Sequence, residues 1–416
     1  MKPEIRQRIE MIRRGEVPEG YKKKCGKVLP LTWDTSKMKE ICIITPLRPE
    51  VIPEKVVFLS MTDVSEDGKI LHQQKVDYQS VKQGFTPFQK GDVLVAKITP
   101  CFENGKGAHT ENLVTDVGFG STEFHVLRSK INSTYTFYHT VFENFRKKLE
   151  REMTGSAGQK RVQTASLANY SIAVPPAAEQ QKIAAILTTQ DKVIELKEKR
   201  LTEKLRQKKY LMQQLLTGRK RLPGFRGEWR EEYLGKLFRE RKETNCEGLE
   251  MLAITGTQGI IPRKELDLKD NSSEDKSKYL RVCIGDIGYN TMRMWQGVSA
   301  YSDYKGIVSP AYTILKPSLL VDAKYFAYLF KMPEMIFLFY RFSQGLVDDT
   351  RNLKYENFKK IKVVYPVDKS EQTAIAQVLS TADREISLLR QDIEQEKQKK
   401  KALMQLLLTG IVRVCP

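Results

Sequence analysis

Cysteines, histidines and paired carboxylates are the side chains best suited to metal binding or acid-base chemistry, and this chain scatters them. A zinc site needs several soft ligands close together. The cysteines and histidines are Cys25, Cys42, Cys101, Cys246, Cys283, Cys415, His72, His109, His125 and His139, and none forms a Cys-x-x-Cys, His-x-x-x-His or His-Glu-x-x-His pair. We therefore expect no metal site and reduced cysteines. The adjacent carboxylates Asp348 and Asp349 fit a solvated turn better than catalysis.

Motifs by which enzymes hold nucleotides or methyl donors are missing from the sequence. It has no Gly-x-x-x-x-Gly-Lys-Ser/Thr phosphate loop and no Gly-x-Gly-x-x-Gly after a strand. The Pro-Pro pair within Val174–Ala177 lacks the flanking Asn or Asp and the aromatic residue of DNA amino-methyltransferases. We predict that the chain is not an enzyme by itself and binds no cofactor, so that partners supply any catalysis.

Length and charge predict a large basic protein. The 416 residues carry 70 Lys and Arg against 51 Asp and Glu, a formal charge of +19, and 40% of them are hydrophobic. Such a chain is globular and too long for one ordinary core. No apolar run is long enough to span a bilayer, and the first ten residues carry charges where a signal peptide has its apolar core. The sequence therefore predicts a cytoplasmic protein without a membrane partner.

The elements that must position any functional residue occur twice. Residues 179–218 align without a gap on residues 371–410, with 18 of 40 positions identical. Upstream matches pair Gly91 with Gly285, Tyr135 with Tyr325, Tyr138 with Tyr328, Gly155 with Gly345, Arg161 with Arg351 and Pro176 with Pro366. The chain is therefore two copies of one unit. We place a first domain at 1–175, a central helical spacer at 176–218, a second domain at 219–368 and a C-terminal helical spacer at 369–416.

Both duplicated segments are predicted to be long helices. Apolar residues recur three and four positions apart, as in a coiled coil, and neither run contains Gly or Pro before its Thr-Gly end. The residues expected to pack helix against helix are Ile183, Leu187, Ile194, Leu201, Leu211, Leu215, Ile375, Leu379, Ile386, Leu389, Ile393, Leu403 and Leu407. Polar positions such as Lys204 and Lys208 favour an antiparallel pair, in which they meet a more apolar stretch. The alternative is two amphipathic helices that pack on their own domains.

Each domain mixes strands with helices. Short β-branched runs such as Val93–Ala96 and Tyr312–Leu315 indicate strands, separated by turns such as Glu66–Gly68. Helical stretches follow near 135–152 and 322–342. We therefore predict an α+β fold of two tandem-repeated domains separated by two long antiparallel coiled-coil helices, with Trp33 and Trp229 in the domain cores.

Several motifs resemble a known family over essentially the whole chain. They are the loop Gly155–Arg161, the stretch Pro175-Pro176-x-x-Glu179-Gln180, the Leu-Leu-Thr-Gly ends at Leu215–Gly218 and Leu407–Gly410, and the segment Leu222–Trp229 that opens the second copy. In tandem they resemble the specificity subunit of type I restriction-modification systems. The second copy departs from this pattern, because Gly345–Asp349 replaces the Gly-Ser-x-Gly-Gln loop and Tyr365–Asp368 carries one proline.

The resemblance implies a sequence-specific DNA-binding subunit. Each target-recognition domain would read one half of a bipartite, asymmetric double-stranded DNA target. The helices would set the spacer between the half-sites and dock two methyltransferase (modification) subunits, and restriction/translocase subunits would join that complex. Two alternatives stay open: the recognition subunit of a modification-only methyltransferase, and a coiled-coil scaffold that does not bind DNA.

The candidate DNA contacts are polar and cationic residues in loops. They are Lys97, Thr99, Asn104, Lys106, His109, Gln159, Lys160 and Arg161 in the first domain, and Thr255, Gln258, Asn290, Thr291, Arg293, Gln296 and Arg351 in the second. Among them, Gln159, Lys160, Arg161 and Arg351 suit phosphate contact better than base reading. For each residue the alternative is an ordinary solvated surface position.

Overall fold

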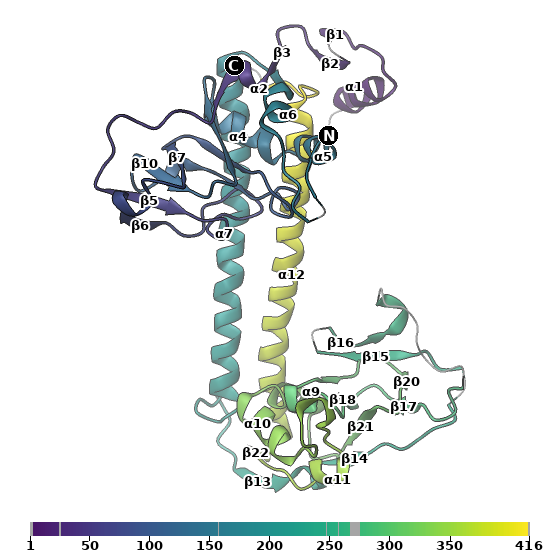
Figure 1. Ribbon diagram of the computed structural model, residues 1–416. Coiled ribbons are helices and arrows are strands. Elements are labelled where there is room, and N and C mark those ends of the chain that lie inside the picture. The colour runs from purple at the N-terminus through teal and green to yellow at the C-terminus, as the bar shows by residue number, and fades with distance from the viewer. Residues whose placement is uncertain are drawn as a thin grey trace. The chain divides into compact units, whose positions relative to one another are not determined.

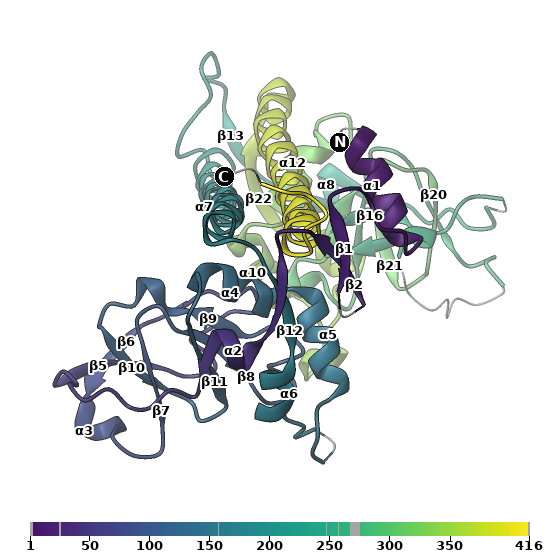
Figure 2. The same cartoon turned by 90° about the horizontal axis from the view of Figure 1, so that it is seen from above.

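The computed structural model describes residues 3–24, 26–156, 158–246, 248–256, 258–266 and 275–414. Among residues named above or contained in the motifs above, Cys25, Ala157, Cys415 and the side chain of Asp349 lie outside the described part. The chain forms two compact units, one of Met1–Leu196 with Ile393–Pro416 and the other of Lys197–Asp392. Figures 1 and 2 show the elements of each unit from two directions.

The first unit consists of a lobe of mixed strands and helices and parts of two long helices. Its strands are β1 (Tyr21–Lys24), β2 (Lys27–Pro30), β3 (Asp34–Lys37), β4 (Cys42–Ile44), β5 (Lys55–Leu59), β6 (Gln74–Asp77), β7 (Thr86–Gln89), β8 (Val93–Ala96), β9 (Gly107–His109), β10 (Val117–Gly120), β11 (Phe124–Ser129) and β12 (Ser171–Val174). Its helices are α1 (Pro3–Arg13), α2 (Met38–Ile41), α3 (Tyr78–Val81), η1 (Thr110–Asn112), α4 (Ser133–Val141), α5 (Glu143–Arg151) and α6 (Thr164–Asn169). Parts of α7 (Ala177–Leu215) and α12 (Lys369–Leu408) complete the unit.

Two four-stranded sheets form the body of the first lobe. One has the order β6-β5-β10-β7 with β5 and β10 parallel, and the other has the antiparallel order β4-β11-β8-β9. All four residues of β8 are buried, as its continuous apolar sequence requires of a central strand. The core that this second sheet shares with α4 and α5 contains Trp33 and Tyr135, and Leu187 of α7 and Leu407 of α12 enter the same core.

The second unit repeats this plan. Its strands are β13 (Trp229–Tyr233), β14 (Phe238–Glu240), β15 (Leu252–Thr255), β16 (Gly259–Pro262), β17 (Leu280–Val282), β18 (Ile287–Asn290), β19 (Ser299–Tyr301), β20 (Gly306–Val308), β21 (Tyr312–Pro317) and β22 (Lys362–Pro366). Its helices are α8 (Leu234–Leu237), η2 (Arg263–Glu265), η3 (Met294–Gln296), α9 (Ala323–Leu329), α10 (Pro333–Phe342), η4 (Asp348–Thr350) and α11 (Tyr355–Phe358), with the remaining parts of α7 and α12. The sheet β14-β21-β18-β19 has the same order as β4-β11-β8-β9, and β13 pairs with β22 as β3 pairs with β12. The predicted α+β class, with two repeated domains and two long antiparallel helices, is confirmed.

Ion pairs and hydrogen bonds between α7 and α12 follow an antiparallel register in both units. In the first unit Gln190 donates to Glu396 at 2.7 Å and Lys400 pairs with Asp191 at 2.6 Å. In the second unit Lys197 pairs with Asp392 at 2.7 Å, Lys204 with Glu385 at 2.6 Å, and Lys208 with Asp383. This register places Lys204 and Lys208 opposite the more apolar stretch of α12 that contains Leu379 and Ile386, as expected. Carboxylates within that stretch, which we had not foreseen as partners, neutralise the lysines and make a less unfavourable environment for a partly buried ammonium group.

The apolar stripe serves two kinds of packing. Ile194, Ile386 and Ile393 are buried in the middle parts of the helices. Ile183, Leu187 and Leu407 lie in the core of the first lobe, and Leu215, Ile375 and Leu379 lie in the core of the second. Each lobe core therefore takes residues from both long helices. None of the described helices is long and apolar enough to cross a membrane.

Candidate nucleic-acid interface

The loop after β8 and the loop Gly155–Arg161 meet in the first lobe. The amide of Val162 donates to the carbonyl of Lys97 at 2.9 Å, and the amide of Thr99 donates to the carbonyl of Lys160 at 3.0 Å. These bonds bring the candidates Lys97, Thr99, Lys160 and Arg161 to one surface.

Two side chains outside our set of candidates, Glu123 and His125, hold this surface together. Glu123 pairs with the guanidinium of Arg161, with nitrogen–oxygen distances of 2.9–3.1 Å. The ring of His125 bonds the carbonyl of Val162 at 2.9 Å, and burial lowers the pKa of His125 to about 4, so the ring is neutral at neutral pH. Burial also lowers the pKa of Lys97, whose Nζ donates to the Thr122 carbonyl at 2.8 Å.

The other candidates of the first lobe differ in how freely they face solvent. Gln159, Lys160 and Asn104 are exposed. Lys106 donates to the carbonyl of Met61 at 2.8 Å. His109 stacks on Phe137 and contacts the Ser133 hydroxyl at 3.2 Å, and burial lowers its pKa. The geometry makes Gln159 and Lys160 the most accessible members of the shared surface.

The second lobe builds the same surface with other side chains. The amide of Leu353 donates to the carbonyl of Thr291 at 2.8 Å; Thr291 is the counterpart of Lys97, and Leu353 lies one residue beyond the position that the repeat matches with Val162. The Thr291 hydroxyl donates to the Ala311 carbonyl at 2.8 Å, and Asn290 accepts the amide of Met292 at 3.0 Å. Arg293, which precedes η3, and Gln296, the last residue of η3, are both exposed.

Arg351 is held within this surface by aromatic and acidic neighbours. Its guanidinium lies 4.1 Å from the ring centroid of Tyr340 and 6.0 Å from that of Trp295, and its Nε is 3.3 Å from Asp348. Thr255 and Gln258 belong instead to the turn of the β15–β16 hairpin, where the Gln258 amide donates to the Thr255 hydroxyl at 2.9 Å.

Behind each surface, a buried glutamate joins the lobe to the long helices. Glu179, at the start of α7, is fully buried and accepts two bonds from Arg413 at 2.8 and 2.9 Å and one from the Trp33 indole at 2.9 Å. Burial alone would raise the pKa of this carboxyl, but Arg413, Trp33 and the Val414 amide together hold it below its usual value. Arg413 follows the end of α12.

The second unit contains the equivalent joint. Glu371, at the start of α12, is fully buried and pairs with Arg221, which follows the end of α7, at 2.5 and 2.6 Å. Arg221 lies over the ring of Trp229, which is half-buried rather than fully buried as Trp33 is. The Glu-Gln motif and the Leu-Leu-Thr-Gly ends are thus neighbours in space, although they lie far apart in sequence.

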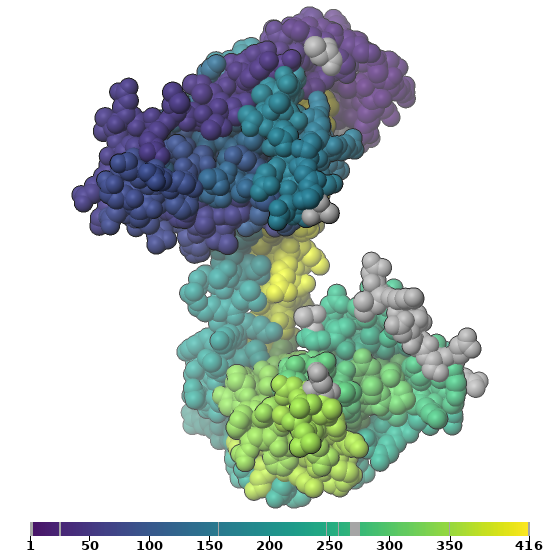
Figure 3. Space-filling model, in the orientation of Figure 1, coloured from purple at the N-terminus to yellow at the C-terminus, as the bar shows by residue number. Residues whose placement is uncertain are grey.

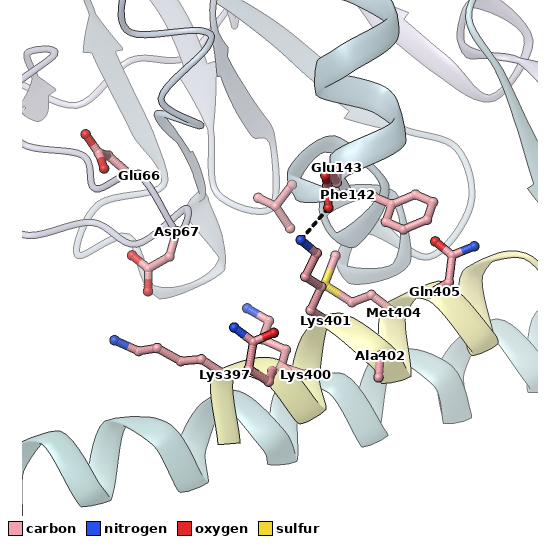
Figure 4. A pocket seen from close by; sticks show the side chains of 12 residues that line it. Glu66, Asp67, Phe142, Glu143, Lys397, Lys400, Lys401, Ala402, Met404 and Gln405 are labelled. Carbon is pink, nitrogen blue, oxygen red and sulfur yellow. Dashed lines mark ion pairs between the residues drawn. The ribbon is translucent and has the colours of Figure 1, made fainter. Parts of the chain in front are cut away.

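A pocket of about 670 Å³ lies between the first lobe and the C-terminal part of α12 (Figure 4). Glu66 and Asp67 line one side, and Lys397, Lys400 and Lys401 project from the helix. Lys401 pairs with Glu143 at 2.7 Å. The bond of Glu143 to Lys147, together with this bond to Lys401, lowers the pKa of Glu143 to about 2. Among the described residues, no three His, Cys, Asp or Glu side chains are placed to hold a metal ion.

Sequence comparison identifies relatives of both repeats. The chain matches the type I restriction modification DNA specificity domain over residues 30–207 and 250–398. It is 34% identical over 188 residues to the specificity subunit of the type I restriction enzyme EcoAI of Escherichia coli, over 42% of this chain and 32% of that one. It is 38% identical over 161 residues to the EcoEI specificity subunit of the same organism, over 37% of this chain and 27% of that one. These matches therefore span about a third of the relatives' length or less.

Three solved structures have a similar fold. A chain from a study of complex assembly and conformational transition of the type I R-M system has a TM-score of 0.58 at 16% identity, covering 92% of this chain and 99% of that one. The HsdS subunit from Thermoanaerobacter tengcongensis gives 0.50 at 18% identity, over 92% and 98%. The S subunit of a type I system from M. genitalium gives 0.56 at 12% identity, over 90% and 96%. At these identities the likeness concerns the fold, while the family match covers most of the sequence in two blocks. The chain therefore belongs to the family of type I restriction-modification DNA specificity subunits.

Proposed function

We propose that this chain is the DNA-recognition subunit of a type I restriction-modification complex. Each lobe reads one half of a bipartite, asymmetric target in double-stranded DNA. The four sequence segments proposed above, with boundaries at 175/176, 218/219 and 368/369, correspond to two recognition domains and two helical spacers. The chain alone methylates and cleaves nothing, and its partners carry the methyltransferase and the endonuclease/ATPase activities.

The observation that carries this proposal is the repeated surface with unlike side chains. In one lobe the carbonyl of Lys97 accepts a bond from Val162 and in the other the carbonyl of its counterpart Thr291 accepts one from Leu353, yet few of the exposed side chains around these bonds agree. Equivalent frames with different polar groups suit two half-sites of different sequence. Residues 1–178 and 219–370 each hold 27 Lys and Arg against 20 Asp and Glu, so both lobes carry a charge of +7 that favours DNA.

The long helices offer one equivalent apolar position in each repeat for a partner. Leu196 is 56% exposed in the first unit, and Leu388, its counterpart in the alignment, is 59% exposed in the second. Two exposed leucines at equivalent positions suit two copies of one protein. We propose that these positions contact two methyltransferase subunits, and that the length of the helices sets the spacer between half-sites.

Mapping of modified bases tests the proposal most directly. DNA from cells that carry this chain and its modification partner should show methylation at one bipartite motif with a fixed spacer, and the motif should disappear without this chain. A random pattern, or an unchanged motif without the chain, would refute the assignment. Cleavage of unmodified target DNA by the complex with its restriction partner separates a full system from a modification-only one.

A further inference from the structure

One loop occupies the same place in both lobes but differs in chemistry, and it closes one residue later in the second lobe, where Gln344 pairs with Asn352, than in the first, where Thr154 pairs with Arg161. Between the matched glycine and arginine, five residues separate Gly155 from Arg161 and five separate Gly345 from Arg351. The first loop includes Ser156, Gln159 and Lys160, and the second has the sequence Leu-Val-Asp-Asp-Thr. The first loop is suited to phosphate contact, whereas the acidic sequence of the second is not.

The second loop is closed on itself by backbone hydrogen bonds. The backbones of Gln344 and Asn352 exchange two hydrogen bonds of 2.8 and 2.7 Å, and the Thr350 amide donates to the Val347 carbonyl at 3.1 Å. Gly345 has a φ of +131°, and a Cβ there would lie 2.7 Å from the Thr350 carbonyl oxygen. A closed loop presents its tip with little conformational entropy left to lose on binding.

The tip of this loop is apolar and exposed. Leu346 is 99% exposed and Val347 is 59% exposed. The neighbouring face of α10 is apolar as well, with Phe337 57% exposed and Tyr340 41% exposed. Residues of α10 and this loop lie at the outer surface of the second unit (Figure 3, light green). In the first lobe the positions equivalent to Phe337 and Tyr340 are Lys147 and Glu150.

The polar side chains of Asp348, Thr350 and Arg351 are engaged with neighbouring groups of the loop. Arg351 pairs with Asp348 and stacks on Tyr340, so its guanidinium is positioned by the protein before any ligand arrives. The loop is continuous with the candidate interface, because Leu353 bonds Thr291 directly after it. Its most accessible chemistry is therefore the apolar edge of Leu346 and Val347. The apolar feature that DNA offers to a protein in the major groove is the thymine C5-methyl group.

We propose that Leu346 and Val347 contact thymine methyl groups in the half-site read by the second lobe. This inference rests on the proposed function and assigns the second loop to base reading, while the equivalent loop of the first lobe contacts phosphate. Arg351, which pairs with Asp348, supplies positive charge beside the tip.

A coupling experiment between protein and DNA tests this assignment. Affinity is measured for the assembled complex of this chain with its modification subunits, on the duplex identified by base mapping and on duplexes with uracil in place of thymine in the second half-site. One uracil should weaken wild-type binding about fourfold, the effect of one methyl group removed from an apolar contact. The Leu346→Ser/Val347→Ser variant should lose a similar factor on thymine DNA and show no further loss on uracil DNA.

Matched controls separate the loop from exposed apolar surface in general. Leu319 is 92% exposed in the same lobe, outside the loop, and Leu319→Ser should leave binding unchanged. Uracil in the first half-site should affect wild type and the loop variant equally. Unchanged thermal unfolding of the loop variant shows that its fold is intact, as expected for two exposed positions.

Several outcomes would overturn the inference. A second half-site that contains no thymine, or an equal uracil effect in wild type and the loop variant, excludes methyl contact. Loop substitution that weakens assembly with the modification subunits but leaves DNA affinity unchanged would make the tip a protein-docking surface. If the wild-type complex shows no sequence-specific binding at all, the proposed function fails, and this inference fails with it.

Discussion

At the scale of single residues, the buried glutamates explain why the Glu-Gln motif and the Leu-Leu-Thr-Gly ends, which lie far apart in sequence, occur together. Glu179 needs a cation because an isolated buried carboxylate is strongly disfavoured, and Arg413 supplies it. Glu371 and Arg221 repeat the arrangement. Both arginines stand three residues after the glycine of a Leu-Leu-Thr-Gly end, so the repeat contained a signal for this pairing that our sequence analysis did not use.

Removing the charge of Glu179 should destabilise the first unit. We expect Glu179→Gln to lower the free energy of unfolding by about 2 kcal/mol, less than for a fully buried pair because Arg413 is one-third exposed. Adding Arg413→Met should recover part of the loss, since no charge is then left unpaired. Chemical denaturation checks both variants, and Glu371→Gln is the matched control that should act on the second unit.

The Glu179 joint should also make stability depend on pH. Because the pKa of Glu179 is lower in the folded chain than in the unfolded one, its contribution is present above the unfolded value of about 4.3. The contribution is lost as the pH falls through the folded pKa. Thermal unfolding between pH 3 and 6 should therefore be less steeply pH-dependent in Glu179→Gln than in wild type, and identical profiles would contradict the assignment.

Lys160 is the candidate best placed for a phosphate. It is exposed in the closed loop of the first lobe, next to the paired Arg161. We expect Lys160→Ala to weaken binding of cognate and unrelated duplexes alike, and to reduce the salt slope of binding by about 1. Titrations at several salt concentrations measure the slope. Lys209→Ala, an exposed helix position, should leave it unchanged, and a loss confined to cognate DNA would instead make Lys160 a base reader.

At the scale of elements, the helix pair was predictable in outline because its apolar stripe repeats every three and four residues. The partners of its lysines were not predictable, because they depend on the register between two segments nearly 200 residues apart. The structure places a tyrosine, an aspartate and a lysine together in both units. Tyr138 donates to Asp191 at 2.8 Å beside Lys400, and Tyr328 donates to Asp383 at 2.7 Å beside Lys208.

Neutralising one aspartate of these clusters should loosen its own unit. We expect Asp191→Asn to cost about 1–2 kcal/mol, because the amide still accepts from Tyr138 but leaves the charge of Lys400 without its carboxylate. Hydrogen exchange should show faster opening of α12 near residue 400. Asp383→Asn should produce the same change near Lys208, and exchange that is unchanged in both variants would show the ion pairs to be dispensable.

The helices should act as a ruler for the DNA target. Removing one matched heptad from 187–205 and one from 379–397 shortens each helix by about 10 Å at 1.5 Å per residue. We expect a shorter spacer between unchanged half-sites, as read from the modified bases. An unchanged spacer in a complex that still methylates DNA would reject the ruler.

At the scale of the whole molecule, each unit has its own core, so the two half-sites should be separable. Exchanging residues 229–366 for the corresponding segment of a relative should change the second half-site and preserve the first, because changes in separate cores are close to additive. Base mapping in cells that carry the hybrid checks this. A change in both half-sites would show that reading is shared between the lobes.

The duplicated plan could be predicted well from the sequence, and the geometry of the candidate interface only in part. Heptad spacing and gapless repeats are local signals, so the lobes and helices could be anticipated. The bonds of Glu123 to Arg161 and of His125 to Val162 join residues with no common motif or period, so only the folded chain shows them. Lys106 and His109 were candidates because of their residue types, yet in the structure both side chains are hydrogen-bonded within the lobe.

The ion pair between Glu179 and Arg413 also affects when the first lobe can finish folding during synthesis. Arg413 is made 234 residues after Glu179, and Met404, Leu407 and Leu408 of the same core come almost as late. At about 5–20 residues per second, the first lobe leaves the ribosome roughly 12–47 seconds before its core can close. Arg221, in contrast, has already been synthesised when its partner Glu371 emerges. Although it is translated first, the amino-terminal lobe completes its fold only after the carboxyl-terminal helix has emerged.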